Sequence, residues 1–376
     1  MIRETTRPSA GRSSRRPAAR LLVAVVLLLA AGCNAVGPRA VRTGRAAYNE
    51  AVVRTWNEQL LLNLVRLRYR DTPFFLEITS VSTQYSLHGS AASGAIAGSG
   101  DDGVNLGLGV DFSESPTITY VPVTGEEFVR QLLTPIPLET LFLLPQAGWS
   151  VERVLLCCVQ RLNDLPNAPA AAGPTPEYVP PYERFHRAAE LLRRLQVAGH
   201  LELGLRPAAP GGGSSGVEYV LRLGAEDGAA EVAELRDLLA LSATDRDVLL
   251  TPGALDRPAG EAMIYPRSLI GVLFFLSQAV EPPPEHAEDG LVTVTRTPAG
   301  EPFAWSEVTG DLLRIRSGAQ APEGAFVAVP YRGHWYWIAD DDLNSKTTFG
   351  LLTQLYSLQS GDRSSSAPLL TLPVGG

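Results

Sequence analysis

The sequence predicts an α+β fold in which helices are segregated from mixed or antiparallel strands and one long Gly-rich β-hairpin stands out. Three observations predict it. Residues 45–70 repeat apolar side chains at helical spacing, residues 84–121 alternate as the arms of a hairpin do, and the last third of the chain contains a series of short strand-like runs. The helical and strand-like runs are not arranged as a regular repeat.

The chain begins with a segment typical of a secretory signal. Six Arg and one Glu precede the apolar run Leu21–Ala31. This run is about 11 residues long, whereas a helix needs roughly 20 to cross a bilayer core. Small residues lead directly to Cys33, which is typical of a bacterial lipoprotein signal, although Ala30 lies where such signals usually carry Leu. We expect residues 1–32 to be removed and Cys33 to be lipidated.

Composition limits the partners of the mature chain. Removing the leader leaves 344 of the 376 residues, enough for one large or two modest domains. It also changes the net charge from −8 to −13, because the leader alone carries +5. Such an acidic chain argues against nucleic acid as a partner and against a polybasic attachment to anionic lipid.

Changes in composition predict the domain organisation. A short tether leads into an N-terminal α+β region, a Pro- and Ala-rich linker follows, and a C-terminal α+β domain precedes a flexible tail. The expected boundaries are 33–44 for the tether, 45–166 for the N-terminal region, 167–181 for the linker, 182–360 for the C-terminal domain and 361–376 for the tail.

The first expected helix, over residues 45–70, is amphipathic. Its apolar residues recur every four positions, and Asp71-Thr72-Pro73 ends it because the residue before Pro avoids the α region. A helix on the membrane surface is one interpretation. We expect packing on the domain core instead, because the polar face is not dominated by Lys and Arg. The apolar stripe consists of Tyr48, Val52, Trp56, Leu60 and Leu64.

The predicted hairpin at 84–121 is the most unusual segment. Its second arm, Val104–Phe112, alternates apolar residues with Asn, Gly and Asp, and Ser99–Gly103 is a strong turn signal. This length and period suit a transmembrane β-strand, but one hairpin alone would leave its edges unsatisfied in lipid, so a ring of copies would be needed. A hairpin covering the domain's own core, or a Gly/Ser loop, remains the ordinary alternative.

The remaining elements follow from apolar spacing and from turn residues. We expect Arg267–Val280 to be a buried core helix, because about 14 residues are too few to span a membrane. Further helices are expected at 126–133, 138–144, 151–162, 182–197, 231–241 and 343–358. Strands are expected at 74–87, 201–205, 217–223, 291–296, 311–316, 325–331 and 334–338.

Residues able to carry chemistry are few. Cys157-Cys158 suit a buried apolar pair better than a redox pair, because adjacent cysteines on a helix point to different faces. Asp340–Asp342 suit helix capping better than metal binding, and Lys346, the single Lys, suits an ion pair with Asp342. The run His334–Ile338 suits a buried strand better than an exposed binding surface. We therefore expect no catalytic residue, no metal and no cofactor.

Several short sequence segments, spread over most of the mature chain, together resemble a family of uncharacterised bacterial lipoproteins. The resemblance implies a lipid anchor and assigns no catalytic residue. The segments are Tyr48-Asn49, Thr55–Tyr69, Pro135–Pro137, Gly148-Trp149, Arg267–Gln278, Tyr331–Ile338 and Asn344–Phe349.

We therefore expect a lipid-anchored, periplasm-facing outer-membrane protein with a binding or assembly role, whose partner is another envelope protein or a second copy of itself. Asn34 follows the lipidated Cys in place of the Asp that usually signals retention at the inner membrane. One alternative is an oligomeric export pore built from the 84–121 hairpin. Another is an enzyme acting on envelope polymers, with Lys346 or Asp341 as the residues to test.

Overall fold

The structure is a computed structural model that describes residues 46–96, 103–123, 125–168, 178–208, 216–224, 229–242, 246–253 and 260–360. The chain divides into two units, Met1–Glu58 and Gln59–Gly376. In the first unit the described residues belong to a helix that runs over residues 46–68. Arg54 and Glu50, one turn apart on this helix, form an ion pair of 3.1 Å that supports it. The fold of the second unit is α+β, as the sequence predicts.

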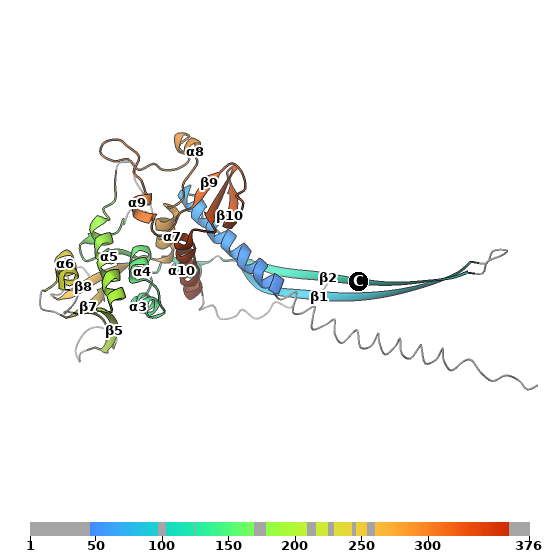
Figure 1. Ribbon diagram of the computed structural model, residues 1–376, viewed down its shortest axis with the longest axis horizontal. Coiled ribbons are helices and arrows are strands. Elements are labelled where there is room, and N and C mark those ends of the chain that lie inside the picture. Colours follow the sequence, from blue (N-terminus) through green and yellow to red (C-terminus); the bar gives the residue numbers. More distant parts are fainter. Residues whose placement is uncertain are drawn as a thin grey trace, which may run out of the picture. The chain divides into compact units, whose positions relative to one another are not determined.

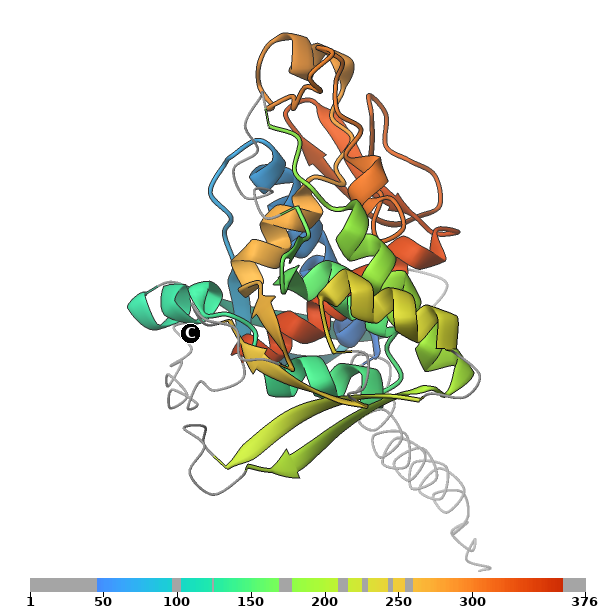
Figure 2. The same cartoon turned by 90° about the vertical axis from the view of Figure 1, so that its left-hand side faces the viewer.

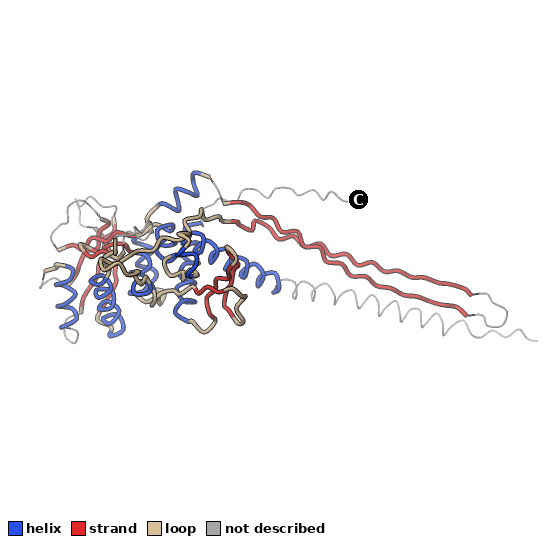
Figure 3. The backbone as a smooth tube through the Cα atoms, turned by 90° about the horizontal axis from the view of Figure 1, so that it is seen from above, coloured by secondary structure: helices blue, strands red, loops and turns tan. Residues whose placement is uncertain are grey.

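Two long strands form a sheet of their own in the second unit. β1 (Leu76–Ile96) and β2 (Gly103–Pro122) pair antiparallel from Leu76↔Pro122 to Ile96↔Gly103 and run side by side over their length (Figures 1 and 3). The ladder shifts register once, between Ile78 and Ser80, which is a β-bulge near the base. The residues that connect the two strands, 97–102, lie outside the described part of the chain.

A six-stranded mixed sheet has the order β4-β3-β8-β7-β6-β5. Every neighbouring pair is antiparallel except β7 and β8, which are parallel. Residues on both sides of the 167–181 segment therefore share one sheet. Its strands are β3 (Val159–Leu162), β4 (Leu165–Pro166), β5 (Leu201–Pro207), β6 (Val217–Leu223), β7 (Asp247–Pro252) and β8 (Glu261–Pro266).

Helices pack on this sheet and on one another. In Figure 2, α3 lies against β5, and α5 and α6 lie side by side. Phe142 of α3 meets Tyr219 of β6 with 4.9 Å between ring centroids. α5 ends at Gly199, whose φ of 74° is the left-handed conformation that Gly adopts without strain. The helices here are α3 (Leu138–Gln146), α4 (Val151–Cys158), α5 (Glu183–Ala198) and α6 (Ala229–Leu239).

The remaining elements are a three-stranded antiparallel sheet of order β10-β11-β9 and several helices. β11 contributes Tyr336 and Ile338, which are fully buried, while His334, Trp335 and Trp337 are partly exposed. The strands are β9 (Arg316–Gly318), β10 (Ala325–Tyr331) and β11 (His334–Ala339). The helices are α2 (Glu126–Leu133), α7 (Leu269–Ser277), α8 (Pro284–Glu288), α9 (Ser306–Thr309) and α10 (Leu343–Ser360).

α7 is the buried core helix that the sequence predicts. Val272, Leu273 and Phe275 have no exposed surface, and the Ser268 hydroxyl caps the helix by accepting from the Gly271 N–H at 3.2 Å. Within the described residues, no helix combines the length and the apolar character that a membrane span requires.

Three local predictions are wrong. The helix expected over 151–162 stops at Cys158, because Val159–Leu162 pairs with β8 as strand β3. The strand expected over 311–316 is also wrong, because residues 311–314 are not in a strand and β9 begins only at Arg316. In addition, the sequence does not indicate the strands β7 and β8. The run 291–296 is not a strand but makes only an isolated bridge, Arg296↔Pro302. For Val159–Leu162, pairing with a segment about a hundred residues later decides the outcome, which local spacing does not show.

Candidate functional site

The candidate functional site is the hairpin β1–β2 and the part of the body that holds its base. Two amide side chains, one helical turn apart, bind the chain at the start of β1 and just before it. Asn63 donates to the Phe74 carbonyl at 2.9 Å and accepts from the Phe74 N–H at 2.8 Å. Gln59 does the same at Leu76, with 3.1 Å to the carbonyl and 2.7 Å from the N–H. The two amides therefore replace a neighbouring strand at the base of the hairpin.

An aromatic contact anchors the same base in the core. Phe75 is 2% exposed, and its ring lies 5.9 Å from that of Phe128 in α2 and 5.0 Å from that of Tyr356 in α10. The Phe75 carbonyl accepts from the N–H of Val123, just after β2, at 2.9 Å. Both arms of the hairpin are therefore fixed where they leave the body.

The register of β1–β2 aligns the two strands by chemical character. Because side chains alternate along a strand, directly paired residues share a face. The apolar positions of β2 lie opposite the apolar or small positions of β1, while the intervening positions pair small and polar residues. The pairs on the apolar face are Leu87↔Phe112, Gly89↔Val110, Ala91↔Leu108, Ser93↔Leu106 and Ala95↔Val104. The pairs on the polar face include His88↔Asp111, Ser90↔Gly109, Ala92↔Gly107 and Gly94↔Asn105.

The outer edges of this two-stranded sheet have no partner strand among the described residues. In an antiparallel pair, roughly half of each strand's backbone groups point away from the partner. An extended strand rises about 3.3 Å per residue, so β1, with 21 residues, is roughly 70 Å long. Two-stranded hairpins are marginally stable in water, and open edges favour pairing with further strands.

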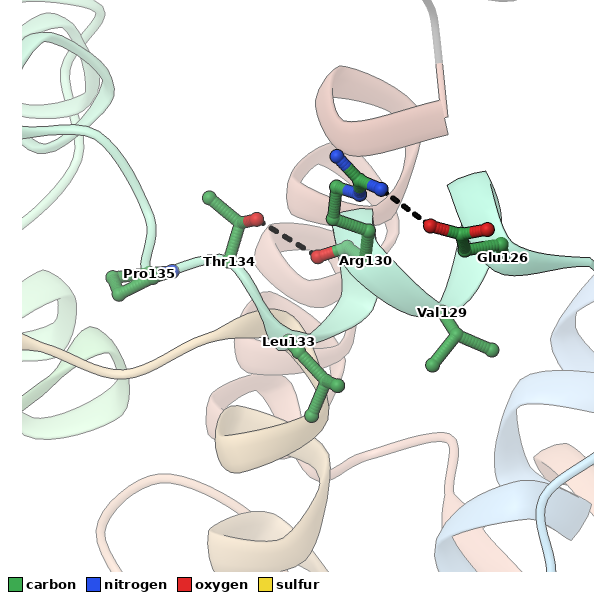
Figure 4. A pocket seen from close by; sticks show the side chains of 6 residues that line it. All are labelled: Glu126, Val129, Arg130, Leu133, Thr134 and Pro135. Atoms are coloured by element: carbon green, nitrogen blue, oxygen red, sulfur yellow. Dashed lines mark hydrogen bonds and ion pairs between the residues drawn. The ribbon is translucent and has the colours of Figure 1, made fainter.

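Apolar side chains are exposed beside the hairpin base. α2 begins shortly after β2 and carries Val129 and Leu133, which are 50% and 62% exposed. Figure 4 shows both pointing to one side of α2, while Arg130 turns to the other side and pairs with Glu126 at 2.5 Å. These residues line an open depression of about 590 Å³. Phe74, just before β1, is 46% exposed.

A buried polar cluster connects the chain before the hairpin with the three-stranded sheet. The Tyr69 hydroxyl lies 2.6 Å from His286 Nδ1 and 2.5 Å from the Tyr336 hydroxyl. Burial raises the pKa of Tyr69 and of Tyr336, so both phenols stay protonated at neutral pH. The two phenols and His286 satisfy one another inside the body, which is the arrangement of a structural network.

An ionic group lies beside this cluster. Asp71 accepts from the Tyr331 hydroxyl and pairs with Arg332 at 2.9 Å, and these two donors hold the pKa of its carboxyl below the ordinary value. His334 Nε2 lies 3.0 Å from a Glu285 carboxylate oxygen. Since Asp71 lies two residues after Tyr69 in the chain leading to β1, both groups fix the direction in which the hairpin segment starts.

Arg267 is a buried charge that backbone carbonyls hold in place. Its guanidinium donates to the carbonyls of Leu156, Cys157 and Val159 at 2.9, 3.1 and 2.9 Å, and to that of Asn167. Burial lowers its pKa to about 10. The first carbonyls belong to the C-terminal end of α4, where the helix dipole favours a cation. Arg267 therefore joins the end of α4 to the start of α7.

The residues that the sequence suggests for chemistry are buried thiols, a helix cap and an ion pair in the structure. Cys157 and Cys158 are free and fully buried, and burial raises the pKa of the Cys157 thiol to about 12. Asp342 caps α10 as predicted, accepting from the Ser345 N–H at 3.0 Å. Lys346 pairs with Asp340 at 2.7 Å, not with Asp342 as predicted, because Asp342 is occupied by the Ser345 N–H and hydroxyl.

The predicted lipidation site, Cys33, lies outside the described residues, as do the leader and the tether. Within the residues that the structure describes, no group of three or more His, Cys, Asp or Glu side chains is placed to hold a metal ion. Comparison with protein-family models, with curated proteins and with solved structures gives no match to this chain.

Sequence reasoning missed Gln59 and Asn63 as the residues that hold the hairpin. A signal was present, because Asn63 interrupts an otherwise apolar run and is only 1% exposed. A buried amide needs partners, so its position predicts a polar contact. Which backbone groups it meets depends on the distant segment that packs there.

Proposed function

We propose that this protein is a lipid-anchored, periplasm-facing outer-membrane protein that works as an assembly component of the cell envelope, with its hairpin as the assembly element. One observation carries the proposal. The β1–β2 register aligns apolar positions on one face of a hairpin whose two outer edges lack a partner strand among the described residues. Further strands would satisfy the open backbone groups and extend the apolar face.

The anchor is the sequence-based part of the proposal. The basic leader, the short apolar run and Cys33 favour export and lipidation, and Asn34 favours the outer membrane. A lipidated N-terminus with several acyl chains is held firmly at a bilayer, whereas a single chain gives only marginal binding. All copies would then have their N-termini at one membrane surface.

A second candidate function, an oligomeric export pore, is favoured by the part of the hairpin farthest from the body. The alternation from Val104 to Phe112 covers about the 9–11 residues of a tilted transmembrane strand. Its opposite face pairs small and polar residues, which suits a water-filled interior. A ring of hairpins would also remove the open edges that exclude a lone hairpin from lipid.

The test of the assembly role is purification of the full chain from detergent-solubilised outer membrane, with mass measured by light scattering. We expect an oligomer in which Leu106→Glu lowers the assembled fraction. The matched control is Asn105→Glu, which adds the same charge at the next position, on the polar face. A monomeric wild-type protein, or an equal effect of both variants, would contradict the assembly role.

The test of the anchor is Cys33→Ser. We expect the variant to be lost from the outer-membrane fraction and to keep its leader, because signal cleavage of a lipoprotein follows lipidation. Mass spectrometry of the native protein should show an N-terminal Cys carrying diacylglycerol. An unprocessed leader on the native protein, or unchanged fractionation of Cys33→Ser, would overturn the proposed location.

The two candidate functions differ in one measurement. A pore predicts ion conductance when the purified oligomer is placed in a planar lipid bilayer, and Leu106→Glu should abolish it. An assembly component without a pore predicts an oligomer that gives no conductance.

A further inference from the structure

We infer that copies of this chain join head to tail, with the open edge of β2 in one copy pairing antiparallel with the open edge of β1 in the next. The apolar side of α2 then receives the neighbouring copy at the hairpin base. This inference rests on the proposed assembly role and names its interface.

Two like edges pairing antiparallel would point neighbouring hairpins in opposite directions. If β2 paired with β2 of a second copy in this way, one strand would run toward the tip while its partner ran toward the base. The two bodies would lie at opposite ends of the shared sheet. The exposed apolar side chains at the two hairpin bases would then also lie at opposite ends and would stay uncovered.

Two like edges pairing parallel would instead turn one hairpin over. A two-fold axis along the strands keeps the direction but exchanges the faces of the sheet. The face bearing Leu106 and Leu108 in one copy would then be continued by the face bearing Asn105 and Gly107 in the other. The amphipathic character that the register builds would be lost at every junction.

Pairing of β2 with the next copy's β1 avoids both problems. β1 and β2 are antiparallel within one copy. An antiparallel β2–β1 contact between copies therefore leaves all hairpins pointing one way and continues the same alternation. All apolar faces stay on one side. Such a head-to-tail contact repeats until it closes into a ring or continues as a filament.

The base of the hairpin supplies side chains for the same contact. α2 follows β2 closely in the chain and lies beside the hairpin base, where Phe128 is held against Phe75 and Val129 and Leu133 are exposed. Phe74, 46% exposed, precedes β1 at the same base. A head-to-tail contact brings the hairpin bases of neighbouring copies to the same end of the shared sheet, where these side chains can cover one another.

The test uses cysteine cross-linking between differently tagged copies of the full-length, membrane-extracted protein. Ser82→Cys places a thiol on β1, and Thr117→Cys places one on β2 at the directly paired position. Each chain carries one substitution, so a cross-link formed by a short bismaleimide joins two copies. The native Cys157 and Cys158 are buried, and the proposed lipidation blocks Cys33.

Mixed Ser82→Cys and Thr117→Cys chains should give cross-linked dimers, while each variant alone should give at least ten-fold less. Efficient cross-linking of either variant with itself would show a two-fold arrangement and overturn the head-to-tail order. An oligomer that yields no mixed cross-link would overturn it as well. A monomer by light scattering would instead contradict the assembly role itself. Failure of the head-to-tail order and failure of the assembly role are therefore distinguishable.

A second pair of variants tests the contact at the base. Leu133→Arg should weaken association at least ten-fold, because it places an unpaired charge in the proposed contact. Glu127→Arg is the control, since it changes the charge of an exposed residue on the same helix. Thermal unfolding should be the same for both variants. Equal association of Leu133→Arg and wild type would show that α2 does not take part in the interface.

Discussion

The side-chain amide of Asn63 forms both hydrogen bonds that a neighbouring strand would form with Phe74, at 2.9 Å to its carbonyl and 2.8 Å from its N–H. Gln59 repeats this one turn earlier at Leu76. The helix over residues 46–68 thus satisfies backbone groups at the base of the hairpin that would otherwise need a third strand. The hairpin starts from a fixed backbone position, which is needed if many copies are to present their strands in one register.

Replacing Asn63 should therefore destabilise the hairpin base. Asn63→Ala leaves the N–H and carbonyl of Phe74 without their side-chain partner, at a cost of about 1–3 kcal/mol per buried group. We expect a lower free energy of unfolding in denaturant titrations and faster amide hydrogen exchange at Phe74 than in the wild type.

The control for this prediction is Gln320→Ala, which removes an exposed amide from the surface. It should change the free energy of unfolding by less than about 0.5 kcal/mol. If Asn63→Ala behaved like the control, the double hydrogen bond would not fix the base.

Arg267 should be irreplaceable even by another cation. It holds the carbonyls of Leu156, Cys157, Val159 and Asn167 with a planar, multiply donating group. Lys has one compact ammonium and cannot reproduce this geometry. We expect both Arg267→Met and Arg267→Lys to lower the free energy of unfolding by about 3 kcal/mol or more. A wild-type denaturation midpoint for Arg267→Lys would show that charge alone is sufficient.

The phenol cluster predicts an order of effects. Tyr69→Phe removes the hydroxyl that both His286 and Tyr336 contact, so two buried groups lose a partner. Tyr336→Phe removes one contact and leaves the Tyr69–His286 hydrogen bond. The first change should cost about 2–4 kcal/mol and the second about 1–2 kcal/mol. Equilibrium unfolding of the two variants measures the order, and the reverse order would contradict a network centred on Tyr69.

His186 predicts a pH dependence of stability. Burial lowers its pKa from the ordinary 6.5 to about 4. In the folded protein it therefore stays neutral down to lower pH than in the unfolded chain, which takes up the proton first as the pH falls. Its contribution to stability is complete above pH 6.5 and is lost as the pH falls toward about 4.

The measurement for His186 is the free energy of unfolding at several pH values between 7 and 4. His186→Gln should flatten the curve in this window relative to the wild type. His200→Gln, which changes a second partly exposed His, serves as the comparison. Identical curves for wild type and His186→Gln would contradict the depressed pKa.

Local pattern and tertiary contact contributed differently along the chain. α7 was predictable because seven of the eight residues from Leu269 to Leu276 are strongly apolar and follow a Ser, which fits a capped core helix. The end of α4 was not, since Val159–Leu162 has the spacing of a continuing helix. It becomes a strand only because β8, about a hundred residues later, offers it a ladder. Long-range pairing of this kind overrides local preference.

The site shows the same division. Alternation along β2 indicated an amphipathic strand, but the partner position of each residue came only from the register. Pairing Leu87 with Phe112 and Ala91 with Leu108 is what brings the two apolar series to one face. A shift by one residue would have separated them.

The sequence by itself determined the α+β class, the buried core helix, the capping role of Asp342 and the burial of Cys157 and Cys158, because these depend on neighbours in the chain and on apolar content. The tertiary structure decided which segments share a sheet, that Lys346 pairs with Asp340, and that Gln59 and Asn63 hold the hairpin base. These contacts join groups whose approach is set by packing, and no local spacing encodes the distance between them.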